Sequence, residues 1–162
     1  MISYKYYRKE KNPIYYAAKE DPIAWHELQL GTYKERVELV YDDYVWLEEY
    51  SEIVQEKTKK NIGEWIKAIS LLDKSNGTCY LLFDSHDEST SWIKSTLVGD
   101  MLELQTGYSH LEGYHWHDTE RVWVESSLPN FIPTSEKFVF SREEIINQLL
   151  PFHVDFQTHV AF

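Results

Sequence analysis

Three of the chain's seven histidines lie close together in the segment YSHLEGYHWHDTERVWVE, which spans residues 108–125. His115 and His117 are two positions apart, so on a strand their imidazoles would point to the same face. Two imidazoles on one face can bind a divalent metal, with His110 or a nearby carboxylate as the third ligand. The spacing is also typical of a strand that turns Trp116 inward and its histidines to solvent. Metal-dependent or acid–base chemistry is therefore the alternative function, and the solvent-facing strand is the favoured interpretation.

Two other segments contain residue types that can act as nucleophiles. DSHDES, at residues 84–89, brings serine, histidine and aspartate together, but triads are assembled from separate elements and no Gly-x-Ser-x-Gly turn is present. Cys79 lies within the apolar run TCYLLF, where burial is expected to make its thiol unreactive. The sequence contains no phosphate-binding glycine loop and no HExxH motif. We therefore expect no catalytic residue and no cofactor.

The acidic residues are unevenly distributed along the chain. The net charge is −11, and residues 21–56 hold ten acids and two bases. Glu48, Glu52 and Glu56 follow each other at four-residue spacing and would form one ridge on a helix, flanked by Glu49. Each like-charged pair at that spacing costs about 0.2–0.5 kcal/mol, which argues for a role beyond helix stability. Solubility alone is the competing explanation, because glutamate is a good helix former.

Aromatic residues accompany the acidic ridge. Tyr44 and Trp46 lie just before it, Tyr50 lies within it, and the pair Asp42-Asp43 precedes them. Carboxylates attract a basic partner and aromatic rings supply buried anchors at an interface. An acidic surface of this kind repels nucleic acid and anionic membranes.

Length and composition place the chain among globular proteins. A single domain over residues 1–162 is expected, since 162 residues with 43% hydrophobic content can bury a sizeable core without metal or disulfide. One cysteine excludes a disulfide framework. The first residues lack the apolar core of a secretory signal, and no apolar run is long enough to span a bilayer. These features predict a cytoplasmic protein.

The hydrophobic pattern predicts the elements that would carry these residues. Helices are expected from Asp42 to Lys60 and, after a capping box at Asn61 and Glu64, up to Asn76-Gly77. A capping box at Ser141 predicts a third helix that Pro151 ends. Strands are expected at residues 2–7, 13–18, 36–41, 78–84, 121–126 and 137–140, with AWHELQLG at residues 24–31 ambiguous and the tail a possible edge strand. WIKSTLV and MLELQTGY, joined by Gly99-Asp100, predict a two-residue hairpin. The predicted class is α+β, with a mostly antiparallel sheet, two central helices and a short C-terminal helix.

The acidic ridge, the pair Asp42-Asp43 and the strand segments WIKSTLVGDMLELQTGYSHLEGY and RVWVES together resemble the immunity proteins of bacterial toxin systems, including contact-dependent growth inhibition. Members of this class are small, cytoplasmic, often acidic and rich in aromatic residues. The resemblance implies a protein that covers the active site of a toxin domain, often a basic nuclease.

The favoured hypothesis is therefore an immunity protein that neutralises a cognate toxin with a basic surface by occluding its active site. It is a binding protein without enzymatic activity, and its partner is neither nucleic acid nor membrane. The expected partner-binding residues are Asp42, Asp43, Tyr44, Trp46, Glu48, Glu49, Glu52 and Glu56. The alternative remains a metal-dependent or acid–base enzyme built on His110, His115 and His117.

Overall fold

The computed structural model describes residues 1–9, 24–39, 47–75, 77–85, 89–110, 128, 130–155 and 158–161. Its strands are β1 (Ile2–Lys9), β2 (Ala24–Leu30), β3 (Tyr33–Leu39), β4 (Thr78–Ser85), β5 (Thr90–Val98), β6 (Met101–Ser109), β7 (Ile132–Pro133), β8 (Phe138–Ser141) and β9 (Thr158–Ala161). Its helices are α1 (Leu47–Leu71) and α3 (Arg142–Val154). The predicted α+β class is confirmed, and the strands expected at residues 13–18 and 121–126 lie outside the described residues.

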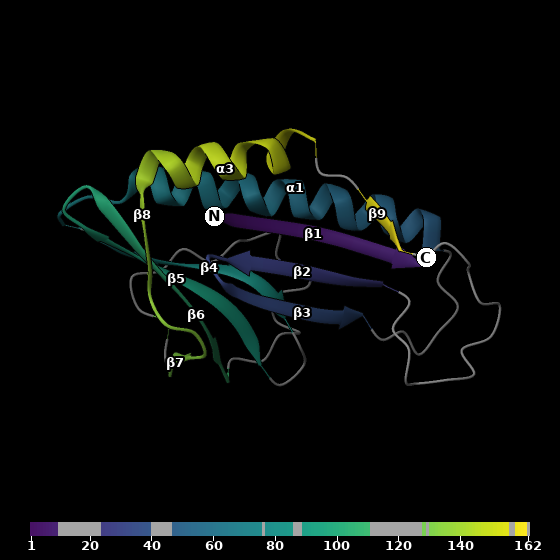
Figure 1. The fold of residues 1–162 in the computed structure, drawn as a ribbon, viewed down its shortest axis with the longest axis horizontal. Helices are drawn as coiled ribbons and strands as arrows, with labels where there is room; N and C mark the ends of the chain where they lie inside the picture. Colours follow the sequence, from purple (N-terminus) through teal and green to yellow (C-terminus); the bar gives the residue numbers. More distant parts are fainter. Residues whose placement is uncertain are drawn as a thin grey trace.

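The strands form two sheets. The first has the order β3-β2-β1-β9, and the second has the order β4-β5-β6-β7, with β8 also paired to β6. All pairings are antiparallel except that of β1 with β9, so the tail does add an edge strand. Figure 1 shows α1 and α3 lying side by side along one side of the two sheets. None of the described helices is both long enough and apolar enough to cross a membrane.

A near-continuous apolar run such as that of β4 is typical of a central strand, but β4 ends the order of its sheet within the described part of the chain. Its apolar character has another cause, since both faces of β4 are covered. Leu81 and Phe83 join the main core on one face, whereas Tyr80 and Leu82 pack with Trp92 on the other. A continuous apolar run therefore reports burial of both faces rather than the position of the strand.

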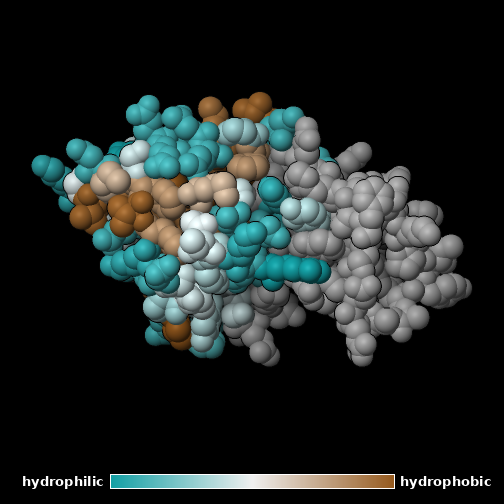
Figure 2. All heavy atoms as spheres, viewed as in Figure 1, coloured by the Kyte–Doolittle hydropathy of each residue, from teal (hydrophilic) through white to brown (hydrophobic). Residues whose placement is uncertain are grey.

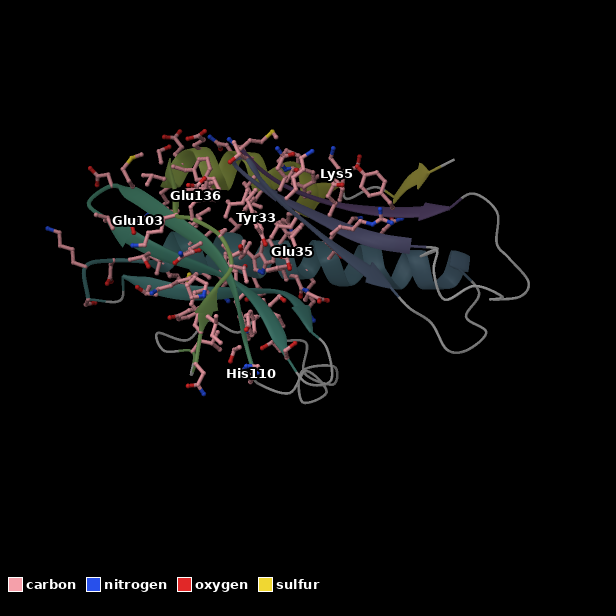
Figure 3. The ribbon with its side chains drawn as sticks, turned by 60° about the horizontal axis from the view of Figure 1, so that its bottom comes forward. Lys5, Tyr33, Glu35, Glu103, His110 and Glu136 are labelled. Carbon is pink, nitrogen blue, oxygen red and sulfur yellow. The ribbon has the colours of Figure 1, made fainter. Side chains whose placement is uncertain are left out.

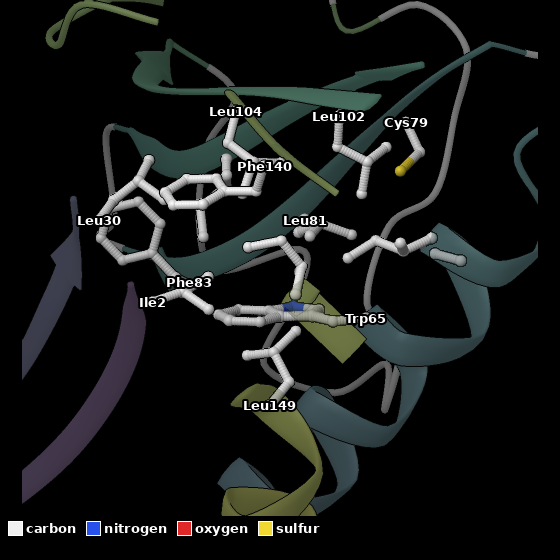
Figure 4. Packing of buried hydrophobic residues seen from close by; sticks show 14 of the residues in the cluster. Ile2, Leu30, Trp65, Cys79, Leu81, Phe83, Leu102, Leu104, Phe140 and Leu149 are labelled. Atoms are coloured by element: carbon white, nitrogen blue, oxygen red, sulfur yellow. The ribbon is translucent and has the colours of Figure 1, made fainter. Parts of the chain in front are cut away.

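Helix α1 is one continuous element where two central helices were predicted. Its buried positions Thr58, Ile62, Trp65 and Ile69 recur every three or four residues and continue in phase past Asn61. Asn61 and Glu64 thus lie inside the helix instead of capping a new one, because an unbroken apolar stripe favours a straight element. Figure 4 shows Trp65 between Leu149 of α3 and the core side chains of the second sheet. Its indole N–H donates to the Leu82 carbonyl at 3.1 Å, so the buried ring keeps its hydrogen bond.

Helix α3 begins as the sequence predicts and ends one turn later than predicted. The Ser141 hydroxyl accepts a hydrogen bond from the Glu144 amide at 3.0 Å, which confirms the cap. Pro151 does not end the helix, which continues to Val154. The last turn is held by its own contacts: the Pro151 carbonyl accepts from the Asp155 amide, and the His153 ring lies 2.9 Å from the Lys59 carbonyl of α1. These contacts offset the one hydrogen bond that proline removes.

Two glycines with positive φ form the turns of two hairpins. Gly99, at φ 64°, begins the predicted two-residue turn between β5 and β6 and faces open space. Gly31, at φ 59°, occupies the turn between β2 and β3, where its amide donates to the Met1 carbonyl. A Cβ added at Gly31 would lie 2.5 Å from the Phe138 ring. This turn of the first sheet is thus packed directly against β8 of the second.

The two glycines give a matched pair for measuring how tightly the sheets are joined. Gly99→Ala adds only the cost of a left-handed alanine, about 1–2 kcal/mol. Gly31→Ala adds the same cost plus overpacking against Phe138, typically 1–3 kcal/mol more. Denaturant unfolding should therefore show a larger loss of unfolding free energy for Gly31→Ala. Equal losses for the two variants would contradict the close contact with β8.

Candidate partner-binding surface

Helix α1 carries four of the predicted partner-binding residues. Glu48, Glu49 and Glu52 lie in its first two turns, although the structure does not describe their side chains. The Glu56 side chain is 76% exposed, and its carboxylate lies 3.4 Å from the Lys59 ammonium. An exposed ion pair of this kind contributes little to stability, and the carboxylate remains open to solvent. Helix positions 48, 52 and 56 follow one another along a single face of α1.

The remaining predicted partner residues, Asp42, Asp43, Tyr44 and Trp46, lie outside the described residues. Their part in binding stays a prediction.

The histidine alternative is described only in part. His110 follows β6, is exposed, and meets the Tyr108 ring edge-on with centroids 5.5 Å apart. Figure 3 shows His110 at the margin of the molecule, away from the labelled carboxylates. His115 and His117 lie outside the described residues, and no group of three histidine, cysteine or acidic side chains suited to a metal occurs within the described ones.

Cys79 lies in β4, and the DSHDES segment begins with the last two residues of that strand. Cys79 is fully buried, and burial raises the pKa of its thiol to about 12, partly offset by the Ser95 hydroxyl opposite. The thiol is protonated at neutral pH and is inert, as the sequence predicts. Asp84 and Ser85 end β4, whereas residues 86–88 lie outside the described part.

The structure reveals a half-buried carboxylate that the sequence reading missed. Glu35 of β3 pairs in register with Leu28, and Tyr33 with Leu30, so both side chains share the core-facing side of the sheet. The Tyr33 hydroxyl donates to Glu35 Oε2 at 2.8 Å. Burial raises the pKa of Glu35, the Tyr33 hydrogen bond opposes that rise, and the charge of Asp84 adds to it. An acid at an inward position of the alternating segment 33–39 was the signal that could have revealed it.

Tyr33 also begins a polar connection between the two sheets, near the place where they cross in Figure 3. Its hydroxyl lies 3.5 Å from Thr134 Oγ1, which lies 3.1 Å from the buried Thr106 Oγ1 of β6. Tyr33 has one hydroxyl proton and gives it to Glu35, so Thr134 must donate to Tyr33 and Thr106 to Thr134. The chain of hydroxyls thus runs from the second sheet to the Glu35 carboxylate.

The position of Glu35 suits protection of a sheet edge. β3 is the last strand of its sheet in the described part of the chain, and an edge strand can pair with strands of other molecules. An inward-pointing charge on an edge strand makes such pairing unfavourable, because a new strand would bury the charge further. We therefore assign this arrangement a structural role.

Comparison with known proteins gives one structural similarity. No protein-family model and no curated protein matches the sequence. The fold is similar to that of a chain in the solved CdiA-CT/CdiI toxin and immunity complex from Enterobacter cloacae, with a TM-score of 0.47 and 10% identity. The similarity covers 96% of this chain and 100% of that chain. At this TM-score and identity it defines no shared binding surface.

Glu35→Gln should stabilise the protein at neutral pH and not at acidic pH. The folded state raises the pKa of Glu35, so the stability linked to this group is greatest below its unfolded pKa and falls as pH rises through the folded pKa. Glutamine keeps an oxygen that accepts the Tyr33 hydrogen bond but carries no charge. Thermal melts should give a higher Tm for the variant at pH 7, and the difference should close near pH 3–4, where Glu35 is protonated.

The matched control is Glu136→Gln, which neutralises an exposed acid. It should leave the Tm nearly unchanged at both pH values. A lower Tm for Glu35→Gln at pH 7 would mean that the carboxylate stabilises the fold, contrary to this account.

Proposed function

We propose that the chain is an immunity protein that binds and neutralises a basic toxin domain. The observation that carries the proposal is the concentration of carboxylates in residues 21–56, with a net charge of −8, on a chain of net charge −11. The exposed carboxylate of Glu56 lies at the end of this segment. Such a surplus attracts a cationic partner and repels nucleic acid.

The proposed mechanism is occlusion of the toxin's active site. A nuclease binds phosphate through lysines and arginines, and a carboxylate ridge competes for the same cations. Glu48, Glu52 and Glu56 would pair with them, while Tyr44 and Trp46 would fill apolar parts of the site. Stable neutralisation calls for an interface of about 800 Å² on each partner, which a single ridge does not supply alone.

Reversing the charge of the ridge should slow association with the toxin. We expect the gene immediately upstream to encode the toxin, so the probe is the C-terminal domain of that gene's product. Its toxicity on expression should be relieved by this chain. With Glu48→Lys, Glu52→Lys and Glu56→Lys combined, stopped-flow mixing at low salt should show an on-rate reduced about tenfold or more. The reduction should shrink as salt is added, because screening removes steering.

A control with the same change of net charge separates position from total charge. Asp73→Lys, Glu143→Lys and Asp155→Lys combined alter exposed acids outside the ridge. If this control slows association as much as the ridge variant, the ridge has no special role. Absence of binding and of growth rescue by the unmodified chain would contradict the proposed function itself.

A further inference from the structure

An exposed apolar patch lies at the end of the β5–β6 hairpin. Val98, Met101 and Val139 are 53%, 40% and 55% exposed. Val98 pairs in register with Met101, and Val139 pairs with Glu103, two residues further along the same strand. Residues paired in this way share a face, and diagonal neighbours are about 7–8 Å apart, so the three side chains form one patch on the outer face of the sheet.

On the rest of this outer face, other segments of the chain cover the apolar side chains. Tyr80, Leu82 and Trp92 point to the same side of the sheet and are buried, because Leu128 and Phe131 cover them. The Phe131 ring meets Tyr80 edge-on with centroids 5.4 Å apart. The chain thus covers one half of the face and leaves apolar side chains open on the other half. Figure 2 shows hydrophobic surface at the end of the molecule that holds the hairpin, bordered by hydrophilic surface.

Carboxylates border this patch. Asp100 lies in the hairpin turn, Glu103 lies directly opposite Val139 on the same face, and Glu136 precedes β8. Figure 3 places Glu103 and Glu136 at this end of the molecule. The Lys137 ammonium donates a hydrogen bond to Glu103 Oε2 at 2.8 Å. Within the described residues no ion pair involves Asp100 or Glu136. Three carboxylates and one ammonium, that of Lys137, thus accompany the apolar patch, and the balance of charge around it is negative.

We propose that the hairpin patch of Val98, Met101 and Val139 is the anchoring surface for the cationic toxin domain, an inference that rests on the proposed function. The argument is charge complementarity: a partner with an apolar centre and a basic border matches both parts of the surface. A second copy of this chain fits poorly, because it would bring like charges together at the border and a net charge of −11 against another −11. Nucleic acid is repelled for the same reason.

The patch and the acidic ridge lie towards opposite ends of α1. The Leu97 amide donates to the Gly77 carbonyl at 2.7 Å, so the hairpin lies near the carboxyl end of the 25-residue helix. The ridge begins at the amino end, and the helix is about 37 Å long at ~1.5 Å per residue. Attraction by the ridge acts before the two proteins touch as well as in the complex, whereas an apolar anchor acts only on contact. The ridge should therefore govern the on-rate and the patch the off-rate.

The test replaces the patch with polar residues of similar shape: Val98→Thr, Met101→Gln and Val139→Thr combined. The matched control makes similar changes at exposed apolar positions away from the hairpin, Ile132→Thr, Leu150→Gln and Val154→Thr. Binding of the upstream-encoded domain is followed by surface plasmon resonance, after melting curves confirm that both variants fold. The patch variant should raise Kd about tenfold or more, mostly through a faster off-rate, and the control should stay within about twofold.

The outcomes separate this inference from the proposed function. If the unmodified chain binds the domain and the patch variant binds equally well, the inference is wrong and the proposed function stands. If the unmodified chain does not bind, the proposed function fails and the inference fails with it. A dimer of the unmodified chain that the patch substitutions dissociate, seen by analytical ultracentrifugation, would assign the patch to a second copy and overturn the inference.

Discussion

The fold depends on burial of one helical stripe of α1 against two sheets. Ile62, Trp65 and Ile69 join the same core as Leu30 of the first sheet and Leu104 of the second. Each fully buried side chain of this size contributes about 1.5–3 kcal/mol, so the shared core is the main force that joins the sheets. Because Trp65 also bonds to the Leu82 carbonyl, the same residue fixes the helix to β4 in one orientation. The packing of α1 on the two sheets therefore sets where the acidic ridge and the hairpin patch lie.

Polar contacts then fix how the sheets meet at their other boundary. The hydroxyl chain from Thr106 to Tyr33 and the close packing of Gly31 on Phe138 join the β2–β3 hairpin to β6 and β8. The carboxylate of Glu35 accepts the last hydrogen bond of that chain, from Tyr33, and burial raises the pKa of this carboxylate. A partly desolvated charge thus lies on an edge strand. Its desolvation costs free energy, but the charge opposes pairing of this open edge with strands of other molecules.

The sequence predicted the elements whose signals are local. The β5–β6 hairpin follows from Gly99-Asp100 between alternating residues, and the start of α3 follows from the Ser141 cap, since both depend on a few neighbouring residues. Predictions failed where packing decides. Asn61 has capping chemistry, but the apolar stripe continues through it. Pro151 is a helix breaker, but the last turn of α3 is held against α1 through His153.

The two candidate surfaces also differ in whether the sequence alone can predict them. An acidic ridge is visible in the sequence because four-residue spacing on a helix is a local pattern. The hairpin patch is not, because Val98, Met101 and Val139 belong to three strands, and each alone is an ordinary strand residue. Only the register of β5, β6 and β8 brings them together, and only the cover supplied by Leu128 and Phe131 shows which half of the face remains open.

The two surfaces are also physically unequal as binding sites. Exposed carboxylates are screened by salt within about 8–10 Å under cellular conditions, so a ridge alone gives fast encounters and short-lived complexes. Apolar contact is not screened, and its strength grows with the area removed from water. The proposed function calls for a slow off-rate, because a toxin that dissociates is free to act. That requirement favours an apolar anchor bordered by charge, which within the described residues is the arrangement at the hairpin end.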